Sequence, residues 1–184
     1  MTDFTNLVAR IAASLLVVEK TTSSSWSHWT LRNNPATPGD FTMSNTWVVQ
    51  GPAAIIVTGD MASMIFERPG GLALRFLMNG FRYIAEKCTA GNVDEYDADL
   101  AEREFEAHME ERLAEADPAR AATLRALLAD DGVNFQNEGH LGQWYHDNIG
   151  DETPCLGRKP SSTLIRALAC IEAVIAFEGV LRSA

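Results

Sequence analysis

Basic residues are scarce in this chain of 184 residues, which has 15 lysines and arginines against 25 aspartates and glutamates. The net charge is −10 at pH 7. Proteins that bind phosphate backbones need the opposite balance, because lysine and arginine neutralise the phosphates. We therefore expect no direct binding of nucleic acid. The length and the 46% hydrophobic content suit one globular domain spanning residues 1–184.

Cysteine is also scarce, and Cys88, Cys155 and Cys170 are far apart in the sequence. An odd number of widely spaced cysteines makes a poor disulfide framework. The C-x-x-C pairs typical of zinc ribbons and thioredoxins are missing. We expect three free thiols and a reducing, cytoplasmic location.

Long uncharged apolar runs are missing as well. The run from Leu15 to Val18 follows Asp3 and Arg10, whereas a secretory signal needs a positively charged start and an unbroken apolar stretch. The apolar C-terminal segment is interrupted by charged residues, among them Arg166 and Glu172. We therefore expect no membrane span.

Motifs that carry catalysis are missing too. The chain has no Walker A sequence, no G-x-G-x-x-G, no G-x-S-x-G and no H-E-x-x-H. Glu104 and His108 are four residues apart, so they share one face of a helix. His140 and His146 are six residues apart, so they do not share a face. Catalytic zinc requires three convergent protein ligands. We assign no catalytic residue and expect neither a metal site nor a cofactor.

The apolar pattern that is present predicts an α+β fold. A helix is expected over residues 3–19, where apolar residues recur at helical spacing. Period-two alternation then predicts an antiparallel meander of about four strands, at 26–32, 41–49, 54–58 and 62–67. Helices are expected at 72–79, 81–89, 97–116, 118–130, 138–148 and 162–181. Strands followed by helices indicate a helical C-terminal half packed on the sheet.

The last predicted helix is apolar almost all round. Leu164, Leu168 and Ile171 lie on one side, and Ile165 and Ile175 leave it without a wide polar face. A helix of this kind is typical of a protein core. We expect it to be central and buried.

Acidic residues are concentrated between Asp94 and Asp117, where eleven acids face only two arginines. Almost all of the net charge lies in this segment. Phe105, Met109 and Leu113 recur every four residues and are expected to face the core. The acids then form either a solvated helix face or a surface that attracts a basic partner. The candidate partner-binding residues are Asp99, Glu104, Glu106, Glu110, Glu111 and Glu115.

A family resemblance covers about a quarter of the chain. An alternating strand from Phe41 is followed by Ala54-Ile-Ile-Val-Thr-Gly-Asp60, then by Ile65-Phe-Glu-Arg68, and then by Tyr83-Ile-Ala-Glu-Lys-Cys88. This pattern resembles small bacteriophage and prophage proteins of unassigned function. The resemblance implies a mobile-element protein that acts on a host component, and it brings no catalytic residues.

Three functional hypotheses remain open at this point. The leading one is a non-enzymatic binding protein that docks on a basic host protein, for example to inhibit a nucleic-acid-handling defence complex. The alternative is a small-molecule or nucleotide binder or hydrolase with a pocket between sheet and helices. The third is an assembly protein. A polar pocket with convergent acids or histidines would favour an enzyme, and a large exposed apolar face would favour assembly.

Overall fold

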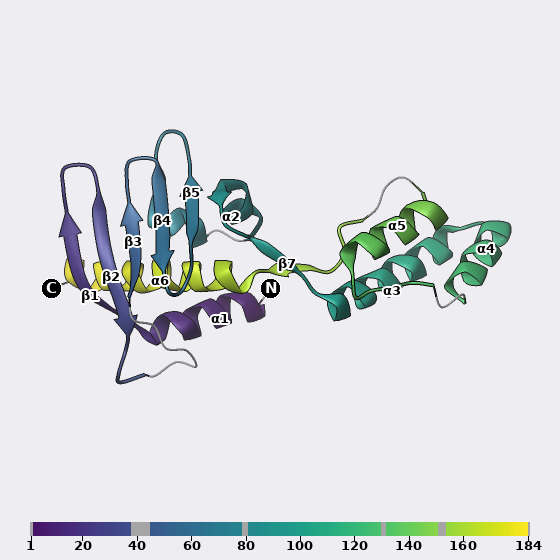
Figure 1. Ribbon diagram of the computed structural model, residues 1–184, viewed down its shortest axis with the longest axis horizontal. Helices are drawn as coiled ribbons and strands as arrows, with labels where there is room; N and C mark the ends of the chain where they lie inside the picture. The colour runs from purple at the N-terminus through teal and green to yellow at the C-terminus, as the bar shows by residue number, and fades with distance from the viewer. Residues whose placement is uncertain (1, 38–44, 79–80, 130–131, 151–153, 184) are drawn as a thin grey trace. The chain divides into compact units, whose positions relative to one another are not determined.

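The computed structural model describes residues 2–37, 45–78, 81–129, 132–150 and 154–183 (Figure 1). It divides into two compact units. Unit 1 comprises Met1–Asp94 and Pro160–Ala184, and unit 2 comprises Glu95–Lys159. The six strands of the main sheet lie in the first half of the chain and most helices lie in the second, so the predicted α+β class is confirmed.

Unit 1 begins with α1 (Thr2–Ala13), which ends earlier than the sequence pattern predicts. The backbone N–H and the hydroxyl of Ser14 both donate to the Ile11 carbonyl, at 3.0 and 2.7 Å, and the chain then enters β1 (Leu15–Thr22). The helix expected over 3–19 is therefore wrong in its second part. The apolar side chains there fit either period, and β-branched residues favour the strand once a partner is available.

The six-stranded sheet is an antiparallel meander in sequence order, β1 to β6. The strands after β1 are β2 (Ser27–Asn33), β3 (Thr46–Gln50), β4 (Ala54–Gly59), β5 (Met64–Glu67) and β6 (Cys88–Ala90). The predicted meander is confirmed, but it has six strands instead of about four. The expectation missed β1 and β6 because both segments were assigned to helices. Residues 41–44 of the expected strand 41–49 lie outside the described residues.

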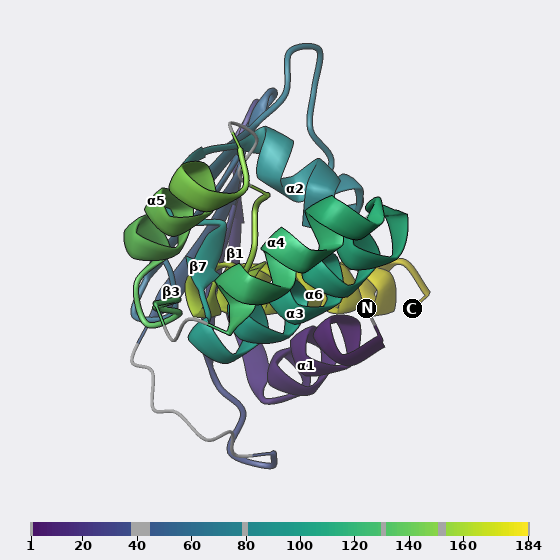
Figure 2. The ribbon, with the colours of Figure 1, turned by 90° about the vertical axis from the view of Figure 1, so that its right-hand side faces the viewer.

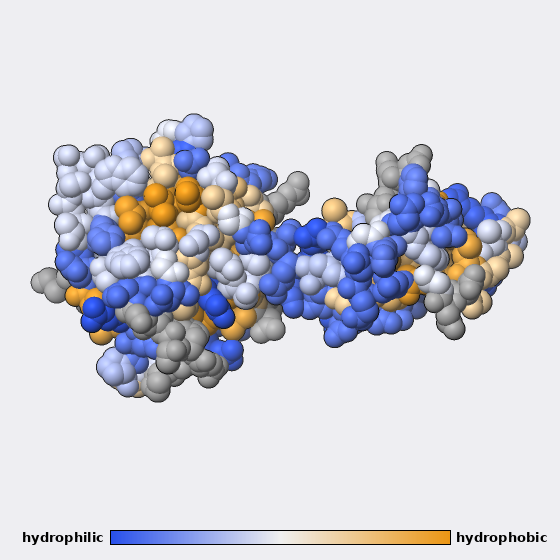
Figure 3. Space-filling model, in the orientation of Figure 1, coloured by the Kyte–Doolittle hydropathy of each residue, from blue (hydrophilic) through white to orange (hydrophobic). Residues whose placement is uncertain are grey.

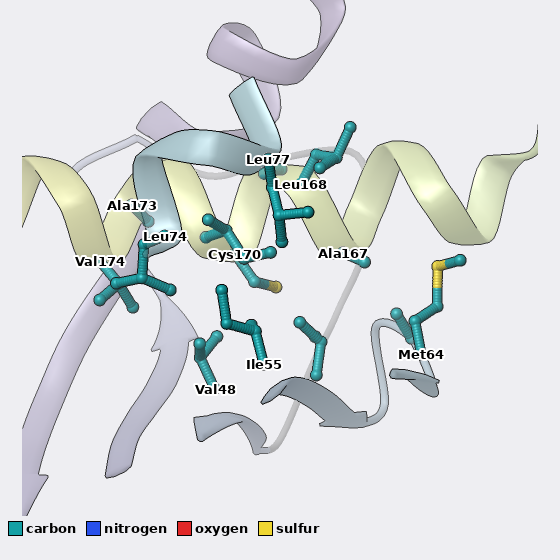
Figure 4. Close-up of a cluster of buried hydrophobic side chains, with 14 of the residues drawn as sticks. Val48, Ile55, Met64, Leu74, Leu77, Ala167, Leu168, Cys170, Ala173 and Val174 are labelled. Atoms are coloured by element: carbon teal, nitrogen blue, oxygen red, sulfur yellow. The ribbon is translucent and has the colours of Figure 1, made fainter. Parts of the chain in front are cut away.

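One face of the sheet forms the core of unit 1. Trp29 pairs with Val48, Val48 with Val57, and Val57 with Met64, so these buried side chains form a row across four strands. Figures 1 and 2 show α1 and α6 side by side on one side of the sheet. Figure 4 shows core side chains from β3, β4, β5 and α6 together with two from the 3-10 helix η1 (Leu74–Met78).

The last helix, α6 (Ser162–Ser183), is the centre of that core. It begins after Ser161, whose hydroxyl accepts the Leu164 N–H at 3.0 Å. It contacts α1, η1 and four strands of the sheet, and Leu164, Leu168 and Ile171 are fully buried. The prediction of a central buried helix is confirmed. Within the described ranges, no helix has the length and apolar character needed to cross a membrane.

Short elements connect the sheet to unit 2. The predicted helix 72–79 is the single 3-10 segment η1, and the predicted helix 81–89 ends early, as α2 (Phe81–Lys87). The chain then forms β6 and β7 (Asp94–Tyr96), and β7 pairs with β8 (Arg158–Pro160).

Unit 2 is helical and has its own apolar core. Its helices are α3 (Ala98–Glu115), α4 (Pro118–Leu128) and α5 (Glu138–Asn148). Their N-caps are Asp97, Asp117 and Asn137, whose side chains accept backbone N–H groups of the first turn. The helix start predicted at Asp117-Pro118 is therefore confirmed. The core residues are Ala101, Phe105, Met109, Leu124, Leu141 and Tyr145.

The buried position of Ile171 gives a stability prediction. Ile171→Ala should lower the free energy of unfolding by about 2–5 kcal/mol, because it removes buried methylenes and leaves a cavity. The control is Arg166→Ala on the exposed side of α6, which should change stability by no more than about 0.5 kcal/mol. Denaturant unfolding measures both. Equal, small effects would show that α6 is peripheral.

The three cysteines differ in exposure, although all are free: Cys155 is exposed, Cys88 half-buried and Cys170 buried. Burial raises the pKa of the Cys170 thiol to about 12 and also raises the pKa of Cys88. In a thiol titration of the native protein at mild pH, Cys155 should react first and Cys170 only after unfolding. The unreduced, denatured protein should show all three thiols. A missing thiol, or a native Cys170 as reactive as Cys155, would contradict this account.

Candidate functional site

The acidic surface is built on α3. Its buried side chains, Ala101, Phe105 and Met109, are four residues apart and face the core of unit 2. This spacing leaves the remaining sides of the helix to polar residues. Five of the six candidate residues are exposed there: Asp99, Glu106, Glu110, Glu111 and Glu115.

Glu104, the sixth candidate, has a structural role. Its carboxylate accepts the backbone N–H of Gly157 at 2.7 Å. Gly157 is buried with φ of +70°, and a Cβ there would lie 2.6 Å from the Cβ of Ala101. Glu104 therefore positions a close approach of residue 157 to α3, and it is not available to a partner in the way that the exposed acids are.

Two acids at the start of the segment, Glu95 and Asp97, share the Lys159 ammonium inside unit 2. The Asp97 carboxylate accepts the Leu100 N–H at 2.9 Å and pairs with the Lys159 ammonium at 2.6 Å. These hydrogen bonds, that from Lys159 first, hold the pKa of Asp97 below its ordinary value. Lys159 also lies 3.6 Å from Glu95. The uncompensated negative charge is therefore on the middle and the end of α3.

A groove lined by six apolar residues and three glutamates runs beside these acids. Its volume is about 700 Å³. The apolar lining consists of Phe105, Met109, Leu113, Leu128, Val133 and Phe135. The remaining lining residues are Glu102, Glu106 and Glu110, which are exposed. In Figure 3 the surface of unit 2 is mostly hydrophilic, with hydrophobic patches between.

Aromatic contacts fix the floor of this groove. Phe105 meets Phe135 and Trp144 edge to face, with both ring-centroid distances at 5.3 Å. Such pairs add to the stabilisation that burial provides. The Tyr96 hydroxyl donates to the Phe135 carbonyl at 2.8 Å and holds that segment in place. The groove is thus a formed part of unit 2.

A second, smaller cavity lies in unit 1, with a volume of about 400 Å³. The Glu178 carboxylate there accepts the Trp29 indole N–H at 2.9 Å and pairs with Lys20 at 2.6 Å. The Gln50 amide donates to the Leu72 carbonyl at 3.1 Å. The cavity has one carboxylate and no histidine among its lining residues. It therefore lacks the convergent acids or histidines expected of an enzyme.

The histidines considered as metal ligands do not converge. His108 Nε2 lies 2.8 Å from the Tyr145 hydroxyl, which also accepts from Arg112 Nη1 at 2.5 Å. Because arginine only donates, the hydroxyl proton is left for His108. His140 lies 3.3 Å from the Asn134 amide. Among the residues that the structure describes, no group of three histidine, cysteine or acidic side chains is placed to hold a metal.

The outer face of the sheet carries apolar side chains. Val49 pairs with Ile56, and Ile56 with Ile65, on the face opposite Val48 and Val57. These three are half-buried. Figure 3 shows a hydrophobic patch over β3, β4 and β5. This face is the feature that the assembly hypothesis would use.

Comparisons of the chain with models of protein families, with curated proteins and with solved structures find no match. The functional argument therefore depends on the residues themselves. Of these, the sequence reasoning missed the groove wall formed by Leu128, Val133 and Phe135. The sequence signal for this wall was the pair Val133 and Phe135, two apolar residues in the polar segment between the predicted helices 118–130 and 138–148.

The hydroxyl of Tyr145 supports a second stability prediction. Tyr145→Phe should lower the free energy of unfolding by about 1–3 kcal/mol, because Arg112 and His108 lose their shared partner in a partly buried place. Tyr83→Phe, at a half-buried position in unit 1, is the control and should have a much smaller effect. Thermal or denaturant unfolding compares the two. Equal effects would show that the Tyr145 network adds nothing to the stability of unit 2.

Proposed function

We propose that this chain is a non-enzymatic binding protein that docks on a basic segment of a partner protein through the exposed acids of α3. The observation that carries the proposal is the position of Glu106, Glu110 and Glu111. They are exposed on α3, whose buried row faces the core of unit 2, and two of them lie beside that row and border the groove. Side chains in this position can contact a partner while the core of unit 2 stays intact.

The charge distribution supports the proposal. Eleven acids and two arginines lie between Asp94 and Asp117, so this segment accounts for nearly the whole net charge of −10. A one-signed surface raises the rate of encounter with a partner of opposite sign. The effect extends over roughly 10 Å at 0.1 M salt. It favours basic proteins and disfavours nucleic acid.

The resemblance to phage and prophage proteins suggests where such a partner is found. A mobile-element protein acts on a host component, and complexes that handle nucleic acid expose basic surfaces. Inhibition of a nucleic-acid-handling defence complex is therefore one concrete form of the proposed function.

A small-molecule binder is the second candidate, and the cavity of about 400 Å³ in unit 1 is the observation that favours it. The Glu178 carboxylate there already has two partners, the Lys20 ammonium and the Trp29 indole. A ligand would have to displace or share these bonds. The acidic surface needs no such rearrangement.

Two matched variants test the proposal. The face variant carries Glu106→Gln, Glu110→Gln and Glu111→Gln, and the control carries Glu19→Gln, Glu67→Gln and Glu86→Gln at exposed positions of unit 1. Both lose three negative charges, so the net charge is equal and only its location differs. Both should fold as stably as the wild type, since exposed substitutions usually change stability by less than about 0.5 kcal/mol.

All three proteins are used as baits in a host lysate, and each captured protein is then purified. We expect a basic protein that the wild type and the control retain and the face variant loses. Its association rate should fall steeply with salt for the wild type and less for the face variant. The proposed function would be contradicted if the face variant captured the same proteins as the wild type and their association rates did not depend on salt.

A further inference from the structure

We infer that the groove of unit 2 receives the apolar side of a basic amphipathic helix. This inference rests on the proposed function and names the chemistry of the partner segment. It depends on two features of the same surface that one ligand must match. The first is the apolar floor of Phe105, Met109 and Leu113, and the second is the acidic rim of Glu102, Glu106 and Glu110.

The floor has the dimensions of two helical turns. Phe105, Met109 and Leu113 follow one another at four-residue spacing, so the row spans about 12 Å along α3. Phe105 and Met109 are themselves buried, so the apolar surface that a ligand can reach is supplied by the half-buried Leu113 and the wall of Leu128, Val133 and Phe135. The volume of the groove is about 700 Å³. A helix laid in such a groove presents apolar side chains at positions i, i+3 or i+4, and i+7.

The rim supplies the sign of the charge. Glu102, Glu106 and Glu110 are also four residues apart and form a second row along α3, next to the floor. The facing wall consists of Leu128, Val133 and Phe135 and carries no charge. The matching helix therefore has lysine or arginine residues about one turn apart along one border of its apolar stripe.

The same charges disfavour other occupants. A second copy of this chain has a net charge of −10, and anionic lipid headgroups and nucleic-acid phosphates carry the same sign as the rim. Like charges placed face to face oppose binding. A purely apolar segment would leave the three rim carboxylates without partners. The basic amphipathic helix satisfies the floor and the rim together.

Synthetic peptides of about 18 residues, long enough to hold a helix, test the inference on the full chain. The first has leucine at helical spacing and lysine elsewhere. The second has the same composition in scrambled order. The third keeps the lysines and replaces leucine by glutamine, and the fourth keeps the leucines and replaces lysine by glutamate. Affinity is measured by calorimetry at low and moderate salt.

The first peptide should bind about tenfold or more tightly than the second and third, and the fourth should not bind. Val133→Trp fills the groove without changing the charge. It should lower the affinity for the first peptide about tenfold and leave the affinity for the third unchanged. Leu128→Trp is the second groove variant, used if the first fails to fold. The face variant should bind the first and third peptides more weakly than the wild type does, and the unit 1 control should bind both as the wild type does.

The outcomes separate the two proposals. If the first and third peptides bind equally, and the filled groove has no effect, the groove inference is overturned while the acidic surface stands. If no lysine peptide binds, or if binding ignores the face variant, the proposed function fails together with the inference.

Discussion

The burial of α6 against the sheet is the interaction on which the rest of the structure depends. The inner face of the sheet is apolar across four strands, and the first helix and the last helix cover it together. The core of unit 1 is therefore incomplete until the end of the chain has returned to it. Residues 95–159 lie between β6 and α6 in the sequence and build a separate core, so the acids of α3 take no part in the core of unit 1.

Within unit 2, the apolar row of α3 divides the acids by role. Asp97 and Glu104 hold the backbone of Leu100 and Gly157, so they belong to the architecture of the unit. Glu106 and Glu110 lie beyond the buried row and border the groove. Because exposed charges of one sign repel each other, they are a cost to folding that a basic ligand would relieve. This physical difference separates the structural acids from the acids that we propose contact a partner.

The elements that the sequence predicts well are those with local signals. A cap followed by proline marks the start of α4, and α6 is apolar almost all round. The strand β1 was missed because its apolar run fits two periods, and the choice depends on pairing with Ser27–Asn33. The Glu104–Gly157 bond joins residues 53 apart, and the groove needs Phe135 beside Phe105. Spacing along one helix cannot predict such contacts.

Hydrogen exchange of the full chain, with and without the amphipathic lysine–leucine peptide, tests the central claim most directly because it locates the bound ligand. The account predicts added protection in α3 from Glu102 to Leu113 and at Val133 and Phe135, with the exchange of the sheet unchanged. Protection confined to the sheet or to α6 would contradict it, and so would unchanged exchange in α3 at peptide concentrations that saturate binding.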